Sequence, residues 1–272
     1  MEQIKIHILH CGSVCVDPAL PDATVARRRL AYTGFLRRKN NRVWLPVSAY
    51  LIEHPKGLIL FDTGWSRQVR ENQKRHMGRI LCRVNQAQLP PGQAVDEQLA
   101  AMNILPADLD YVILSHLDCD HVSGLKMLGG AKNVLVSRNE INDAKRSPFR
   151  YRSSMWDGVP LKTFRFSEPD YGPFSAYFDL FGDGSVLLTD ISGHSAGLAA
   201  MTVQRDGKYA LLYADGGYSA QAWKDIRLPG MTRSTGKAAR ALMWIRDMSM
   251  RPNCIESVAN HDPDVKPHVI LV

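Results

Sequence analysis

The sequence lacks several features that define large classes of protein. It has no stretch approaching the about 18 uncharged apolar residues that a membrane-spanning helix needs. Residues 1–5 lack the charged start, the apolar segment and the small-residue cleavage site of a signal peptide. Cysteine occurs at only five scattered positions, which argues against a disulfide framework and suits a reducing compartment. We therefore expect a cytoplasmic protein that has no membrane partner.

Linkers of low complexity and repeats of fixed period are also absent. The chain is 45% hydrophobic and 22% charged, which is typical of a compact globular protein. Its 272 residues exceed the usual size of one domain, but a single large α/β unit can reach this length and bury a substantial core. We expect one domain over residues 1–272.

The net charge of +7 comes partly from two basic stretches, residues 67–83 and 138–165. A basic surface can attract nucleic acid or anionic substrates. No binding motif with interleaved aromatic residues accompanies the charge, so solvated helix faces are the favoured interpretation. We expect no nucleic-acid partner.

The hydrophobic pattern predicts alternating strands and helices. Residues 4–9 alternate as a half-buried strand does, and residues 47–52 and 58–61 flank a turn at Pro55-Lys56-Gly57, as in a hairpin. Residues 111–114 form a short apolar run that is typical of a strand buried on both faces. Further strands are expected at residues 134–136, 185–189, 209–213 and 268–272, helices at 96–102, from about 139 and at 236–250, and an aromatic, proline-rich loop at 147–173.

Residues 115–124, directly after the run 111–114, read S-H-L-D-C-D-H-V-S-G. Two histidines and two aspartates therefore occupy six positions, and a loop past a buried strand can turn such side chains toward one point. Held together, they would repel or desolvate one another unless a cation compensated. The motif predicts a metal site.

Three more potential ligands follow apolar strands or lie in glycine-flanked turns: His194, Asp215 and His261. Glycine permits the sharp turns that would bring them inward. Taken singly, each is more typical of a surface histidine or of an ordinary turn, so none predicts a site alone.

In this order the seven residues resemble the metal-binding signature of the metallo-β-lactamase superfamily. The resemblance implies an α/β fold, an αββα sandwich of two mixed β-sheets flanked by helices, with the site at one edge of the sheets. Residues 49–64, 105–110 and 192–194 are similar to the branch that contains N-acyl-homoserine lactonases. Tyr218, three residues beyond Asp215, lies where those lactonases carry a tyrosine that contacts the substrate carbonyl.

Carried over position by position, the resemblance implies two divalent metal ions, with zinc as the first expectation. His116, Asp118 and His194 would hold one ion, Asp120, His121 and His261 the other, and Asp215 would bridge them. Asp118 departs from the family pattern, which has histidine there. A carboxylate favours oxygen-preferring ions such as iron or manganese relative to zinc.

The resemblance also implies a mechanism, in which a metal-bridging hydroxide opens a lactone ring. Tyr218 would donate a hydrogen bond to the carbonyl oxygen, Asp120 would carry the proton to the leaving oxygen, and Asp62 and Thr63 would orient ligands. The expected substrate is a small molecule such as an acyl-homoserine lactone, whose hydrolysis is quorum quenching.

Two alternatives stay open. The first is a thioester or another ester as substrate, in a glyoxalase-II-like reaction. The second is a signal-binding protein without catalysis, for which Asp118 is the sequence support. Nuclease branches carry an additional domain for which this length leaves no room, and a homodimer is not excluded. Residues 65–92 and 147–175 are expected to form the pocket walls, with aromatics that contact an acyl chain or cover the core: Trp65, Phe149, Trp156, Phe164 and Phe166.

Overall fold

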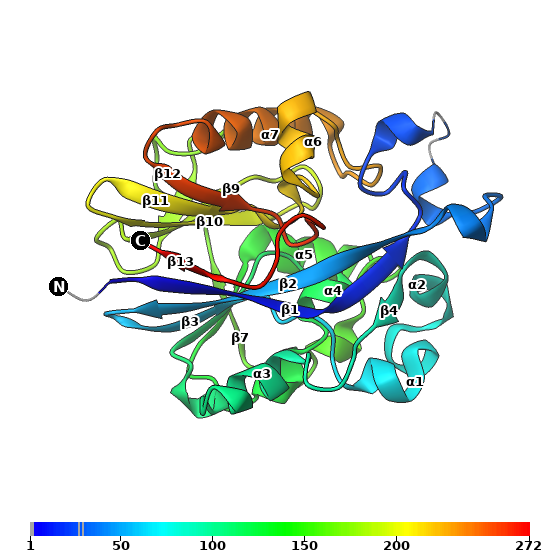
Figure 1. The fold of residues 1–272 in the computed structure, drawn as a ribbon, viewed down its shortest axis with the longest axis horizontal. Helices are drawn as coiled ribbons and strands as arrows, with labels where there is room; N and C mark the ends of the chain where they lie inside the picture. The colour runs from blue at the N-terminus through cyan, green and yellow to red at the C-terminus, as the bar shows by residue number, and fades with distance from the viewer. Residues whose placement is uncertain (1–2, 27, 29) are drawn as a thin grey trace.

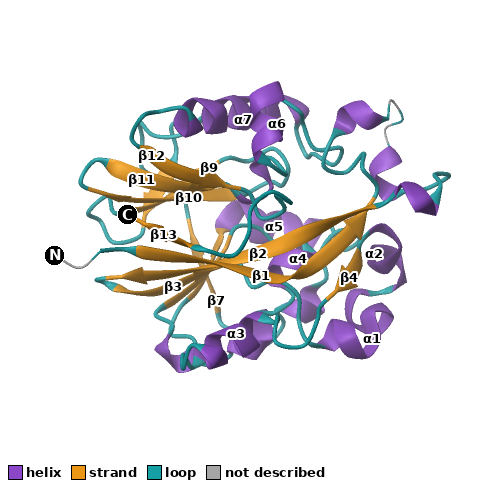
Figure 2. Cartoon of the chain, in the orientation of Figure 1, coloured by secondary structure: helices purple, strands orange, loops and turns teal. Residues whose placement is uncertain are grey.

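The computed structural model describes residues 3–26, 28 and 30–272. The prediction that residues 1–5 carry no signal peptide falls partly on Met1 and Glu2, which lie outside the described residues. Two β-sheets face each other, and helices cover their outer faces (Figure 1, Figure 2). This arrangement is the αββα sandwich that the resemblance implies. No helix in the described part of the chain has the length and apolar character that crossing a bilayer requires.

The first sheet is mixed and has the order β13-β1-β2-β3-β5-β6-β7, with the short β4 paired to β1. Neighbours from β13 to β3 are antiparallel, whereas β3, β5, β6 and β7 run parallel. The strands are β1 Lys5–Val16, β2 Val43–His54, β3 Gly57–Phe61, β4 Gln86–Gln88, β5 Tyr111–Leu114, β6 Val134–Ser137, β7 Leu161–Phe164 and β13 Val269–Leu271.

The second sheet has the order β12-β11-β10-β9-β8 and is antiparallel except for the pair β11 and β12. Its strands are β8 Tyr177–Asp179, β9 Val186–Asp190, β10 Ala199–Arg205, β11 Lys208–Leu212 and β12 Cys254–Val258. The two sheets bury the apolar side chains of their facing surfaces against each other, as the two-residue period of a strand requires. This central layer includes Ile6, Ile8, Ile52, Ile59 and Phe61 from the first sheet and Leu188, Met201, Val203 and Leu212 from the second.

The helices form the two outer layers. The first sheet is covered by α3 and its neighbours, and the second by α6 and α7 (Figure 1). The α-helices are α1 Gln68–Met77, α2 Arg79–Val84, α3 Val95–Ala101, α4 Cys119–Val122, α5 Arg138–Arg146, α6 Ala220–Asp225 and α7 Thr235–Ser249. Short 3-10 helices lie at Ala23–Val25, Ala31–Thr33, Lys39–Asn41, Pro106–Asp108, Leu125–Leu128, Ser153–Met155 and Ala214–Gly216.

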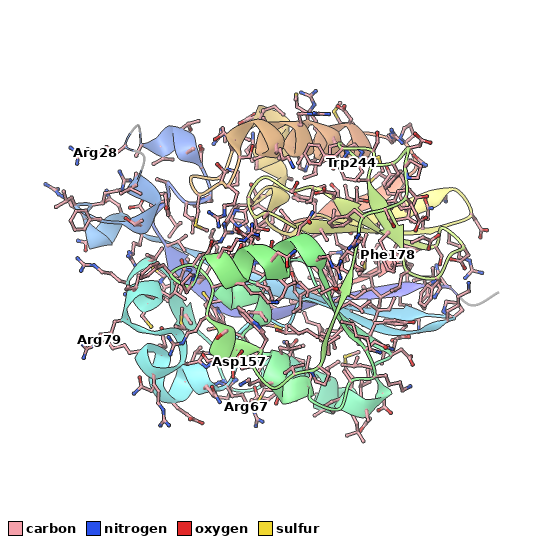
Figure 3. All side chains as sticks on the ribbon, turned by 180° about the vertical axis from the view of Figure 1, so that it is seen from behind. Arg28, Arg67, Arg79, Asp157, Phe178 and Trp244 are labelled. Carbon is pink, nitrogen blue, oxygen red and sulfur yellow. The ribbon has the colours of Figure 1, made fainter. Side chains whose placement is uncertain are left out.

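The first basic stretch forms the exposed helices α1 and α2, as the solvated-face interpretation expects. Arg67 and Arg79 are exposed and lie at the periphery of the molecule (Figure 3). The side chain of Arg67 pairs at the surface with Asp96 at 3.0 Å.

The local structure differs from the expectations in several places. The strand expected at residues 4–9 is present but continues to Val16. The alternation of the sequence did not reveal this continuation, because it is interrupted at an irregularity between His10 and Ser13, where Gly12 adopts a φ of 89°. The expected loop 147–173 contains β7, a four-residue edge strand too short for a clear period. The strands β4, β8 and β12 were not foreseen. The side chains of β12 are mostly half-buried and do not alternate.

Candidate metal centre

The seven predicted ligands converge at one edge of the sandwich. His116 follows the end of β5, and His194, Asp215 and His261 follow β9, β11 and β12. Because these strands end at the same edge, residues separated by up to 145 positions meet there. All seven side chains are buried, with at most 8% of the residue surface exposed: His116, Asp118, Asp120, His121, His194, Asp215 and His261.

One group consists of His116, Asp118 and His194, which can offer ligand atoms within 4.8 Å of one another. The Oδ2 atom of Asp118 lies 3.4 Å from Nε2 of His116 and 3.1 Å from Nε2 of His194. We call these three residues the first half-site.

The second half-site consists of Asp120, His121 and His261. Nε2 of His121 lies 3.3 Å from Nε2 of His261, which in turn lies 3.5 Å from Oδ2 of Asp120. Asp120 and His121 lie on the single turn α4 rather than in a loop, which corrects the expected loop geometry. The loop that precedes α4 carries His116 and Asp118, so the helical turn has to position only Asp120 and His121.

Asp215 lies between the half-sites. Its Oδ1 is 3.2 Å and 3.3 Å from Nε2 of His121 and of His261, and its Oδ2 is 3.6 Å from Nε2 of His194. The structure therefore brings the seven named residues together and places Asp215 between the two half-sites, and their roles as ligands stay a prediction.

The hydrogen bonds of the histidines show what these half-sites can hold. Nδ1 of His194 lies 3.0 Å from the carbonyl of Met231, and Nδ1 of His261 lies 2.8 Å from that of Pro46. A carbonyl only accepts, so each Nδ1 donates. In its neutral form, each ring then presents an Nε2 lone pair to the carboxylates and to the neighbouring histidines.

Facing lone pairs repel unless a proton or a cation lies between them. Nε2 of His116 and Oδ1 of Asp215 are, in addition, buried without a hydrogen-bond partner. Buried polar atoms without partners are rare and require an explanation. Neutral imidazoles with carboxylates are suitable ligands for divalent transition metals, so the donor set fits such ions.

Charges near the cluster shift its pKa values in opposite directions. Burial raises and the nearby His261 and His121 lower the pKa of Asp215, with a net result well below its usual value. Burial lowers and the neighbours Asp215 and Asp62 raise the pKa of His121, which ends well above its usual value. The second half-site thus already favours a positive charge beside Asp215.

Asp62 and Thr63 form hydrogen bonds to the motif at residues 115–121, as expected of residues that orient ligands. Asp62 Oδ2 accepts hydrogen bonds from Nδ1 of His121 at 2.8 Å and from Asn260 at 2.8 Å, and its Oδ1 accepts from the amide of Ser115 at 2.8 Å. Thr63 Oγ1 donates to the carbonyl of His121 at 2.8 Å. Partners of this kind fix the tautomer and the direction of an imidazole.

Glu140 of α5, which the sequence analysis did not single out, connects two loops of the centre. Its fully buried carboxylate accepts from the amide of Leu117 at 3.2 Å, from Ser195 Oγ at 2.7 Å and from the amide of Gly197 at 2.9 Å. A side chain at Gly197 would collide with α5, so glycine is required for this close approach. The loops that carry His116 and His194 are therefore held in a fixed relation.

Arg150 is the second residue that the sequence analysis missed. Its Nε and Nη2 atoms donate to the two oxygens of Asp118, each at 2.7 Å, and Nη1 donates to the carbonyl of His194 at 2.9 Å. Only 13% of its side chain is exposed. Burial raises the pKa of Asp118, but Arg150 and the neighbouring histidines outweigh burial and hold it well below the usual value.

A cavity of about 270 Å³ opens onto the cluster. Asp118, Asp120, Asp215 and Tyr218 form its polar end. Its apolar walls come from β1, α2 and neighbouring loops and include Val14, Val16, Leu20, Ile80, Leu81, Val84, Phe149 and Met231.

Tyr218 lies beside both half-sites. Its ring stacks on His261 with centroids 5.1 Å apart and meets the His194 ring edge-on at 6.2 Å. Burial first, and then the carboxylates of Asp215, Asp120 and Asp118, raise the pKa of Tyr218 well above its usual value. The hydroxyl therefore stays protonated and can donate a hydrogen bond.

The expected pocket walls are partly confirmed. From these two segments, the residues that line the cavity are Ile80, Leu81, Val84, Asn85, Phe149 and Arg150. Of the five aromatics named for these walls, Phe149 lines the cavity, whereas Trp65, Trp156 and Phe164 are buried in the apolar clusters and Phe166 packs against one of them. Core packing is therefore the role of these four.

Comparisons with known proteins agree with this geometry. The family model of the Metallo-beta-lactamase superfamily matches residues 42–208. The chain is 29% identical over 228 residues to an N-acyl homoserine lactonase, AttM, of Azorhizobium caulinodans, which covers 82% of this chain and 84% of that protein. It is 26% identical to a probable metallo-hydrolase of Mycobacterium tuberculosis, over 79% of this chain and 71% of that one.

The fold also matches solved structures. One is an N-acyl homoserine lactone hydrolase with the product N-hexanoyl-L-homoserine bound at its catalytic metal center, with a TM-score of 0.76 and 20% identity over 97% of this chain and 95% of that one. Another is a dizinc quorum-quenching lactonase, AidC, with a TM-score of 0.62 and 15% identity over 100% of this chain and 95% of that one.

Proposed function

Because the chain belongs to the metallo-beta-lactamase superfamily, we propose that it is a metal-dependent hydrolase that opens the ring of a lactone, with N-acyl-homoserine lactones as the substrate class. One observation carries the proposal: two groups of metal-competent side chains share Asp215 beside Tyr218 at the polar end of a largely apolar cavity. The lactonase names of the relatives support the same substrate class.

The half-sites would hold two divalent ions, the first through His116, Asp118 and His194 and the second through Asp120, His121 and His261, with Asp215 shared. Zinc suits the four imidazoles, and the three carboxylates also admit iron or manganese. When bound, such ions lower the pKa of water toward neutrality and polarise a carbonyl. These residues are the basis for hydrolysis rather than for binding alone.

Tyr218 and Asp120 complete the reaction. The protonated Tyr218 hydroxyl donates to the carbonyl oxygen of the substrate as negative charge develops on it. Asp120, which faces both the cavity and the second half-site, passes a proton to the ring oxygen when the ring opens. Water is the second reactant, and the single product is a hydroxy acid that carries the new carboxylate and the new alcohol on one molecule.

The charge distribution of the cavity favours a neutral substrate. Among the described residues that line it, Arg150 is the basic one, and its guanidinium is already paired with Asp118. The described residues of this lining therefore offer no unpaired positive charge that would bind an anionic ester. The aliphatic walls match the acyl chain of a lactone, whose burial contributes roughly 0.8 kcal/mol for each CH₂ group.

Several further expectations belong to this proposal. A small-molecule substrate and a quorum-quenching role follow from the substrate class. The cytoplasmic location is supported by five free thiols. One domain over residues 1–272, a homodimer and the absence of a nucleic-acid partner stay predictions from the sequence.

A hydrolysis screen tests the function. Protein stripped of metal is reloaded separately with zinc, iron(II) or manganese and assayed on acyl-homoserine lactones, simple lactones, thioesters and phosphodiesters. We expect the highest kcat/KM on an acyl-homoserine lactone. A thioester or phosphodiester that is hydrolysed much faster than every lactone would reject the lactonase assignment.

Replacing Tyr218 by phenylalanine is expected to lower kcat on the best lactone by roughly tenfold to a thousandfold, the scale on which the loss of one oxyanion donor is felt. The ring contacts with His261 and His194 stay, so metal content and thermal stability should not change. Tyr171→Phe is the matched control, because that hydroxyl bonds Thr202 in the second sheet. An unchanged kcat would assign Tyr218 to packing.

A further inference from the structure

The Asp118–Arg150 pair distinguishes the two half-sites. Arg150 holds both carboxylate oxygens of Asp118 in a fork of two 2.7 Å hydrogen bonds. Such bidentate pairs are strong and fix the plane of the carboxylate. Oδ2 of Asp118 therefore faces Nη2 of Arg150 on one side and the Nε2 atoms of His116 and His194 on the other.

The pair has no counterpart in the second half-site. Among the described residues, Asp120 has one ion-pair partner, His261, which belongs to the same half-site. Its carboxylate therefore keeps its negative charge for a bound ion. The first half-site contains one carboxylate and one guanidinium, whose charges cancel, so it attracts a cation less strongly.

We propose that Asp118 and Arg150 act together as one neutral ligand unit in place of a histidine, so that the first half-site binds its ion reversibly and the second half-site binds its ion tightly. Asp118 supplies the oxygen, and Arg150 cancels its charge and holds it in position. The inference rests on the metal-binding part of the proposed function and is independent of the substrate.

Two features argue that Arg150 is built into the centre rather than placed there by chance. Its side chain is largely buried, which is unfavourable for a cation without a close partner. Its third bond, from Nη1 to the carbonyl of His194, ties it to the loop that carries another residue of the same half-site. Arg150 is thus a positioning residue for the first half-site.

Metal binding alone tests the inference. The chelator-treated parent protein is titrated with zinc, and separately with manganese, by isothermal calorimetry, and metal content is measured by elemental analysis after dialysis. We expect two binding steps whose affinities differ by at least about tenfold, with one ion retained on dialysis. Two equal, tight steps in the parent would overturn the proposal without any substitution.

Arg150→Met identifies the cause. Removing the guanidinium leaves Asp118 charged and free to bind the ion, so the weaker step should tighten by roughly tenfold or more while the tighter step stays unchanged. Arg150→Lys keeps the charge and should stay within a few-fold of the parent. Arg152→Met is the matched control, because its guanidinium bonds the carbonyl of Arg75 and not Asp118.

The outcomes separate the two proposals. The role of Arg150 is overturned if the weaker step does not tighten in Arg150→Met. It is also overturned if that step tightens equally in Arg150→Lys and Arg150→Met. Neither result bears on lactone hydrolysis, which the substrate screen tests separately. A parent that binds no metal overturns both. Two-step binding with slow lactone hydrolysis supports the role of Arg150 and rejects the proposed substrate.

Discussion

Asp215→Ala is expected to abolish the metal centre and to lower lactone hydrolysis by roughly a thousandfold or more, because one carboxylate faces both half-sites. Oδ1 lies within 3.3 Å of both histidine nitrogens of the second half-site. Without the Asp215 carboxylate, no anion lies between His121 and His261. The ion of each half-site would then lose one ligand.

The measurement is metal content after dialysis together with kcat on the best lactone. Asp179→Ala is the control, because that carboxylate accepts hydrogen bonds from the turn at residues 181–184 in the second sheet and should leave both quantities unchanged. Retention of two ions and of the parent rate by Asp215→Ala would exclude Asp215 as the shared residue.

Asp118→His is expected to destabilise the protein although it restores the family pattern. Histidine cannot replace the two acceptor oxygens that hold Arg150, so a largely buried guanidinium loses its counter-charge. Breaking a buried ion pair from one side costs about 3–5 kcal/mol. We expect a free energy of unfolding lower by about this amount in the metal-free protein, with weaker metal binding and slower lactone turnover.

The double variant Asp118→His/Arg150→Met tests whether the unpaired guanidinium of Arg150 causes the loss of stability. With the unpaired cation removed, most of the lost stability should return, measured as the denaturant midpoint of the metal-free protein. Asp247→Asn, at an exposed carboxylate on α7, is the control for a changed charge alone. A single variant Asp118→His that is as stable as the parent and more active would show that Asp118 marks a decayed site.

The motif at residues 116–121 could be recognised from its local pattern, whereas His194, Asp215 and His261 could be added only through the resemblance. A histidine or an aspartate follows an apolar run or a glycine turn, and strands that end at a common edge bring such positions together. The orienting roles of Asp62 and Thr63 were expected from the resemblance, because residues that hydrogen-bond to ligands are common around metal sites. The αββα sandwich itself was reached through resemblance, since strand patterns alone do not fix how two sheets face each other.

Arg150 and Glu140 could not be found in this way. Both come from the segment around α5, where charged residues are abundant, and nothing in the local pattern shows which of them turns inward. Arg150 meets Asp118 across 32 positions. One signal was available: an aspartate at a position that holds a neutral residue in the family requires a nearby cation if it is buried.

The expected loop at residues 147–173 illustrates the same limit. Its short strand β7 is defined by pairing with β6 at the edge of the sheet and not by its own sequence period. Strand pairing is a non-local property, and a four-residue segment carries too few positions to reveal it.

The two kinds of wall around the cavity bear on how substrate range can change. Val14 and Val16 belong to β1, which continues into the central core and pairs with β2, β4 and β13, so a larger side chain there would strain the sheet. Ile80 and Phe149 line the opposite part and are 63% and 81% exposed, so a change in their size disturbs few neighbours. Substitutions that adapt the cavity to longer or shorter acyl chains are therefore expected in α2 and at Phe149. In β1 such substitutions would destabilise the sheet.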